Sequence, residues 1–134
     1  MKRKEEFSTV DVCELSNLTY RQLSHWSASG ILIPSIKRPM GSGSQSVYSA
    51  DDVYIARLLS EIISLTGPVR SLLLYEIVTS AREMVEVVDE LPETVYVTFG
   101  RKASVTNVRP EGFAHLVIHP STIIKESDND NERE

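Results

Sequence analysis

The sequence predicts an α+β fold in which helices precede a small antiparallel β-sheet. Two observations carry this prediction. Up to about residue 91, helix-start signals and apolar residues three or four positions apart indicate helices. From residue 94 onward, apolar and polar residues alternate in short runs, separated by turns that contain Gly or Pro. At 134 residues, 41% of them apolar, the chain is expected to form one compact domain with a small appendage.

Composition argues against several classes of protein. No stretch approaches the roughly 18 to 20 apolar residues of a membrane span, and the charged start MKRKEEF lacks the apolar region of a secretory signal. A single cysteine, Cys13, allows neither an internal disulfide nor a cysteine-based metal cage. Because Asp11 and Glu14 lie beside it, we expect an inert buried thiol rather than a redox sensor. The expected location is the cytoplasm, with no membrane partner.

The net charge of −5 is distributed unevenly along the chain. Residues 1–48 carry six Lys or Arg and four Asp or Glu, whereas residues 49–134 carry eight and fifteen. The first part therefore has a charge of +2 and the second a charge of −7. This asymmetry permits a nucleic-acid-binding face in the first part, although six basic residues in 48 is an ordinary number.

Three capping boxes predict three helix starts. In each, a Ser or Thr is followed three residues later by a side chain that can reach back to the cap backbone. The pairs are Ser8 with Asp11, Thr19 with Gln22, and Ser49 with Asp52. The expected helices cover about residues 9–16, 20–28 and 50–65.

A short β-hairpin is expected between the second and third helices. In the second helix, Leu23 and Trp26 are three positions apart and should share a buried face. Ile31–Pro34 is expected to be an extended strand, because this short apolar run ends in Pro. A turn with Gly and Ser at its tip follows over residues 38–46, and Val47–Tyr48 returns as the second arm. A short helix pair followed by such a hairpin is typical of a winged helix-turn-helix.

Residues 69–91 have a nearly heptad-like apolar spacing, with steps of four and three. Such spacing is typical of a seam between helices, here either a dimer seam or the packing of a helix into its own chain. The expected dimerisation residues are Leu73, Ile77, Met84 and Val88. Thr79–Ser80 with Glu83 has the spacing of a further capping box. Both one long helix and two helices hinged near Thr79 are therefore kept as hypotheses.

Three strands are expected in the last third, at 94–99, 103–108 and 114–119, followed by a turn of helix at 121–125. The acidic end of the chain, ESDNDNERE, is expected to be a disordered tail. The expected domains are a winged helix-turn-helix over 1–79, a linker or dimerisation helix over 80–92, a β unit over 93–126 and the tail over 127–134.

Residues 7–78 contain the segment TYRQLSHWSASGIL, followed by GSGSQSVYS. The residues that form a recognisable pattern are Leu15, Thr19, Arg21, Leu23, Trp26, Gly30, Ile31, Leu32, Pro34, Tyr48, Ser49 and Asp52. With this pattern, residues 7–78 resemble the DNA-binding domain of MerR-type regulators, and are particularly similar to a branch found in actinobacteria and their phages. The resemblance implies a winged helix-turn-helix that binds double-stranded DNA, with the second helix in the major groove.

The resemblance also implies roles for individual residues. Tyr20 and Arg21 would enter the major groove, and Tyr48 would hydrogen-bond a phosphate at the end of the wing. For Arg21, base readout is favoured over an ordinary surface cation, because Arg with guanine is the commonest specific contact. The candidate DNA contacts are Thr19, Tyr20, Arg21, Gln22, Ser24, His25, Lys37, Arg38, Ser42, Gln45 and Tyr48.

Two positions depart from the family pattern. Ser24 and Ser46 stand where members of this family often have Arg. Each missing Arg removes a phosphate or minor-groove contact, so a lower affinity and a weaker salt dependence are expected.

No cofactor, metal or catalytic activity is expected. His115 and His119 share one face of a predicted strand but have no third ligand, and the cysteines of the metal-sensing branch are absent. The sequence contains no obvious nucleophile–base pair, P-loop or dinucleotide-binding glycine pattern. The protein is therefore not expected to be an enzyme.

The leading interpretation is a sequence-specific transcriptional regulator that acts as a homodimer. Its C-terminal part would mediate dimerisation, or would contact RNA polymerase or another protein. One alternative is an excisionase-like factor of a phage or integrated element that bends DNA for a recombinase. A second is a protein-interaction module with weakened DNA contacts, motivated by Ser24, Ser46 and the net charge.

Overall fold

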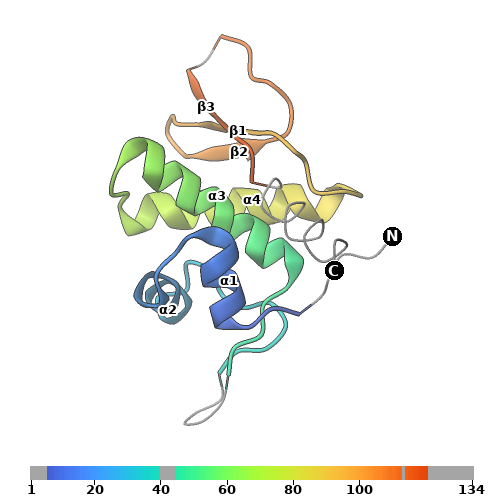
Figure 1. The fold of residues 1–134 in the computed structure, drawn as a ribbon. Helices are drawn as coiled ribbons and strands as arrows, with labels where there is room; N and C mark the ends of the chain where they lie inside the picture. Colours follow the sequence, from blue (N-terminus) through green and yellow to red (C-terminus); the bar gives the residue numbers. More distant parts are fainter. Residues whose placement is uncertain (1–5, 40–44, 113, 121–134) are drawn as a thin grey trace.

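The computed structural model describes residues 6–39, 45–112 and 114–120, in which four helices precede a three-stranded sheet (Figure 1). The helices are α1 (Thr9–Ser16), α2 (Tyr20–Ala28), α3 (Ala50–Thr66) and α4 (Ser71–Val87). The strands are β1 (Val95–Thr98), β2 (Ser104–Thr106) and β3 (His115–Ile118). The α+β class is confirmed, whereas the expected turn at 121–125 and the tail lie outside the described residues. Within the described ranges, no helix is long and apolar enough to cross a membrane.

All three predicted capping boxes are present. At the start of α1, the Ser8 hydroxyl accepts a hydrogen bond from the Asp11 amide at 3.1 Å, and the Ser8 amide donates to the Asp11 carboxylate at 3.0 Å. The starts of α2 and α3 have the same reciprocal bonds. Asn17, with φ of 57°, provides the left-handed residue that ends α1 before the turn into α2. The predicted starts of these three helices are therefore confirmed.

Residues 71–87 form one helix, so the hypothesis of a hinge near Thr79 is wrong. The Thr79 hydroxyl donates to the carbonyl of Tyr75 at 2.9 Å, one turn back in the same helix. Two of the expected dimerisation residues, Ile77 and Met84, are only 0% and 8% exposed. Leu73 and Val88 are partly buried. Ile77 and Met84 are therefore enclosed by their own chain, which agrees with the intramolecular alternative. A dimer seam along α4 stays a prediction.

The sheet has the strand order β2-β1-β3, with both pairs antiparallel. Val95, Val97 and Ile118 point inward and are at most 1% exposed. They belong to one buried apolar cluster that runs from Phe7 to Ile118 and includes residues of all four helices. Figure 1 shows the sheet over α3 and α4, on the side away from α2 and the hairpin. The domain boundary expected between residues 79 and 80 falls inside α4.

The segment Ile31–Pro34 is not a strand, contrary to expectation. Gly30, with φ of 81°, turns the chain after α2. The amides of Ile31 and Leu32 then donate to the carbonyl of Trp26 at 2.9 and 3.2 Å, closing the end of the helix. Leu32 is fully buried. The apolar run therefore fills the core below the helix end instead of pairing with a second strand.

Candidate nucleic-acid interface

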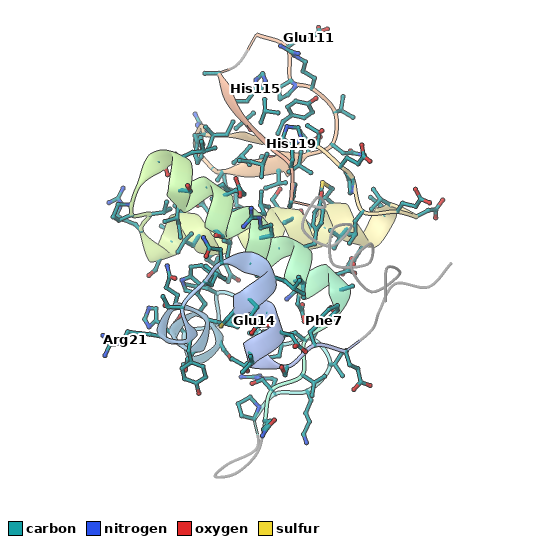
Figure 2. The ribbon with its side chains drawn as sticks, viewed as in Figure 1. Phe7, Glu14, Arg21, Glu111, His115 and His119 are labelled. Atoms are coloured by element: carbon teal, nitrogen blue, oxygen red, sulfur yellow. The ribbon has the colours of Figure 1, made fainter. Side chains whose placement is uncertain are left out.

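Helix α2 presents a polar face because its other face is fixed in the core. Leu23 and Trp26 are 0% and 4% exposed, and they set the rotation of the helix about its axis. The side chains left in solvent are those of Tyr20, Arg21, Ser24 and His25. Figure 2 shows Arg21 pointing away from the body of the molecule. The buried face predicted for the second helix is therefore confirmed.

Thr19 and Gln22 hold the start of α2. The Thr19 hydroxyl accepts from the Gln22 amide at 3.0 Å, and the Gln22 side-chain oxygen accepts from the Thr19 amide at 3.0 Å. That oxygen also accepts from the Thr19 hydroxyl at 3.2 Å. Both side chains are thus used to shape the helix start, and the amide oxygen of Gln22 is engaged within the chain.

The base of the hairpin is held by two isolated bridges. Lys37 and Val47 exchange backbone hydrogen bonds of 3.0 and 2.9 Å, which pair the two arms. Phe7 and Tyr48 exchange bonds of 2.9 and 2.8 Å, so the segment before α1 pairs with the returning arm. No pattern in the sequence indicates the pairing of Phe7 with Tyr48. The hairpin tip, including the candidate Ser42, lies outside the described residues.

A hollow of about 490 Å³ separates α2 from the hairpin. Helix α2 contributes Tyr20, Ser24 and Ser27 to its lining, and the hairpin contributes Arg38 and Gln45, together with Ser46. Most of these side chains carry a hydroxyl, an amide or a cation. Such groups suit a phosphate or sugar oxygen, because each can donate a hydrogen bond. Five candidate residues, two from α2 and three from the hairpin, are thus brought to one site: Tyr20, Ser24, Arg38, Gln45 and Tyr48.

Tyr48 lies in the lining of this hollow, but it is only 1% exposed. Burial raises the pKa of Tyr48, while side-chain hydrogen bonds with Ser27 and Ser46 act in the opposite direction. The structure places Tyr48 among the supports of this face rather than on its outer surface. A phosphate contact through its hydroxyl, implied by the resemblance, stays a prediction.

A second hollow, of about 590 Å³, lies on the other side of α2, next to the α3–α4 connection. Its polar lining comes from Arg21, Gln22 and His25, and its apolar lining includes Pro68 and Val69. The candidate residues of α2 therefore divide between two sides, with hydroxyl groups toward the hairpin and cationic or imidazole groups toward the α3–α4 connection. Lys37 and Arg38 add two exposed cations at the hairpin.

A buried carboxylate holds the root of the hairpin against the helices. Asp52 is 0% exposed, and its Oδ2 accepts from the amides of Ser35 and Ser49 and from the Ser35 hydroxyl, each at 2.8 Å. Its Oδ1 pairs with the guanidinium of Arg82 on α4, which also donates to the carbonyl of Ile33 at 3.0 Å. The capping-box pattern predicted the role of Asp52 at the start of α3. No pattern in the sequence indicates its ion pair with Arg82.

The described residues bring together no group of three or more His, Cys, Asp or Glu that could hold a metal ion. Burial raises the pKa of Cys13, and the neighbouring charge of Glu14 raises it further. A raised thiol pKa disfavours the reactive thiolate, which agrees with the expectation of an inert cysteine. The side chain is partly buried, not fully buried as predicted.

Comparison with known proteins gives partial matches to regulators. The chain is 35% identical over 51 residues to an uncharacterized HTH-type transcriptional regulator of Mycobacterium bovis and to one of Mycobacterium tuberculosis. The matched part is 38% of this chain and 23% of each of those proteins, so the chain spans about a quarter of their length. No family model matches the chain. Both of these relatives carry the name of a helix-turn-helix type transcriptional regulator.

Proposed function

We propose that this protein is a sequence-specific DNA-binding transcriptional regulator of the winged helix-turn-helix type. The observation that carries the proposal is the exposed polar face of α2, which has Tyr20 and Ser24 toward the hairpin and Arg21 and His25 on the other side. A helix of this kind fits the major groove, where base edges can be read directly. The names of the partial matches agree with this class of protein.

In this arrangement the hairpin acts as a wing on the flanking backbone. Arg38 and Gln45 line the hollow beside α2, and Lys37 is exposed at the hairpin base. These groups would position the protein on phosphates, while Arg21 and Tyr20 would read bases. The MerR-like character of the regulator belongs to the same proposal and rests on the resemblance in residues 7–78.

Few cations are available on this face, so the salt dependence should be modest. Arg21, Lys37 and Arg38 are the exposed Lys or Arg among residues 6–39 and 45–48. If each neutralises one phosphate, the slope of log affinity against log salt should be about −3 per protomer. A small slope agrees with the weaker salt dependence expected from Ser24 and Ser46.

The test is fluorescence anisotropy on an operator selected from a random duplex library. Arg21→Ala should weaken operator binding by about 1–3 kcal/mol and relax the preference at one base position. Arg109→Ala serves as the matched control, because Arg109 is an exposed cation that follows β2 in the sheet. Equal binding by wild type and Arg21→Ala would remove Arg21 from the readout.

Lys37→Ala separates phosphate contact from base readout. It should weaken binding about equally for all sequences and reduce the magnitude of the salt slope by about 1. If the wild-type protein retains no duplex DNA at about 50 mM salt, where electrostatic attraction is strong, the proposed function is wrong. The protein-interaction alternative would then be favoured.

A further inference from the structure

Strand β3 lies at one edge of the sheet and has a nearly palindromic sequence. The order β2-β1-β3 leaves one side of β3 without a neighbouring strand among the described residues. From residue 115 to residue 119 the sequence reads His-Leu-Val-Ile-His, which is symmetric in residue type about Val117. An edge strand presents unpaired backbone groups that can pair with another chain.

The two faces of β3 differ. Ile118 is 1% exposed on the inner face, whereas Val117 is 45% exposed on the outer face, opposite Tyr96 of β1. His115 also lies on the outer face, with its ring edge-on to that of Tyr96 at a centroid distance of 5.4 Å. Side chains alternate between the two faces along a strand. A partner strand can therefore pair only in a register in which opposite residues lie on the same face.

We propose that two copies of this chain associate edge to edge through β3, antiparallel and centred on Val117. In this register Val117 lies opposite Val117 of the second copy. Leu116 lies opposite Ile118, and His115 lies opposite His119. Each residue meets one of its own chemical type and keeps its face. A two-fold interface requires this kind of self-complementarity, because the same strand forms both halves.

Charge favours the β3 edge over the β2 edge. Residues 114–120 contain no Lys, Arg, Asp or Glu, so two chains of net charge −5 can meet there without opposing like charges. The β2 edge is flanked by exposed Arg101 and Lys102 on one side and by exposed Arg109 on the other. Antiparallel pairing of two β2 edges would bring these cations together, at a cost in free energy.

The symmetry also suits the proposed function, on which this step of the inference rests. The two-fold axis of an antiparallel pair of identical strands is perpendicular to the sheet. Both helical layers therefore lie under the same face of the resulting six-stranded sheet. Since α2 and the hairpin lie on the helix side of each protomer (Figure 1), the α2 helices and hairpins of both copies lie on the same side of the six-stranded sheet. One duplex can then meet two copies, as two-fold operators require.

Disulfide trapping tests the register. In a Cys13→Ser background, Val117→Cys should cross-link to itself under mild oxidation, because directly opposite Cβ atoms lie about 4.5–5.5 Å apart. A mixture of His115→Cys and His119→Cys chains should cross-link as heterodimers, with much less product from either chain alone. Ser104→Cys is the matched control, an exposed residue of β2. Cross-linking by Ser104→Cys as fast as by Val117→Cys would overturn the proposal.

Sedimentation of the full chain without DNA tests the association itself. One short strand buries less than the roughly 800 Å² per partner of a standard interface, so a dissociation constant in the micromolar range is expected. Val117→Lys places two like charges on the two-fold axis and should weaken association about tenfold or more. A wild-type chain that stays monomeric at about 100 μM would refute the dimer. That result would leave DNA binding by a monomer untouched, and failure of Arg21→Ala to alter binding would leave the dimer untouched.

Discussion

The α3–α4 pair is attached to its two neighbours in different ways. Toward the hairpin, the attachment is ionic and joins a buried carboxylate to a partly buried guanidinium. Asp52 on α3 joins Arg82 on α4 and Ser35 on the connection that leads into the hairpin. Asp52 lies 17 residues from Ser35 and 30 residues from Arg82 in the sequence. One carboxylate therefore holds three segments together.

Toward the sheet, the attachment is mainly apolar, with separate hydrogen bonds to the backbone. Ser80 on α4 accepts from the amide of Val105 at 2.8 Å and donates to its carbonyl at 3.3 Å. The Glu76 carboxylate accepts from the Ala103 amide at 3.0 Å, and the Tyr54 hydroxyl donates to the Pro92 carbonyl at 2.6 Å. The two Ser80 bonds share one hydroxyl, but the contacts of Ser80, Glu76 and Tyr54 have no atom in common, so each of the three contacts can be lost separately.

The difference predicts how each attachment fails. Removing one partner of a buried ion pair leaves a charge without compensation, whereas removing one neutral hydrogen bond costs much less. The hairpin side should therefore be sensitive to single substitutions. The sheet side should lose stability in smaller steps.

The largest effect is expected for Arg82→Ala. It leaves Asp52 buried without its cation and should reduce the free energy of unfolding by about 3–5 kcal/mol. Chemical denaturation followed by circular dichroism measures this change. Glu83→Ala is the control, since Glu83 is an exposed residue of the same helix. A loss no larger than that of the control would show that Arg82 does not hold the hairpin root.

Arg82→Ala together with Asp52→Asn distinguishes charge from packing. If the uncompensated charge causes the loss, the double variant should recover part of the stability lost by Arg82→Ala alone. Recovery of nothing would instead assign the loss to the contacts of the guanidinium with the carbonyl of Ile33.

A smaller effect is expected for Ser80→Ala, on the sheet side. It leaves the Val105 amide without the Ser80 hydroxyl and should cost about 1–2 kcal/mol. Hydrogen exchange at the Val105 amide should accelerate more than exchange in α2, because the bond is local to α4 and β2. Equal acceleration in both places would mean that the two attachments are not separate.

The smallest effect at neutral pH is expected for Tyr54→Phe. Loss of the bond to Pro92 should cost about 1 kcal/mol. Burial raises the pKa of Tyr54 far above its usual range, so the folded state favours the neutral phenol. Its contribution is complete below the unfolded pKa of about 10 and is lost progressively as pH rises above that value. When the pH rises from about 10 to about 11, the free energy of unfolding should fall less for Tyr54→Phe than for wild type. Tyr75→Phe, which removes an exposed phenol, should show the same fall as wild type.

Local signals made much of the fold predictable. The three capping boxes fix the starts of α1, α2 and α3 through hydrogen bonds that span three residues. The spacing of Leu23 and Trp26 also predicted which face of α2 is exposed. Alternation in the last third predicted all three strands. These features depend on residues close in the sequence, so the sequence alone determined them.

Tertiary structure decided the features that depend on distant residues. The pairing of Phe7 with Tyr48 and the ion pair of Asp52 with Arg82 join segments 41 and 30 residues apart. Periodicity identified Ile77 and Met84 as apolar positions, but only the packing of α3 and the sheet against α4 showed that their own chain buries them. An apolar stripe has the same spacing whether it meets its own core or a partner, so the surface that remains for a partner emerges only after the chain has closed on itself.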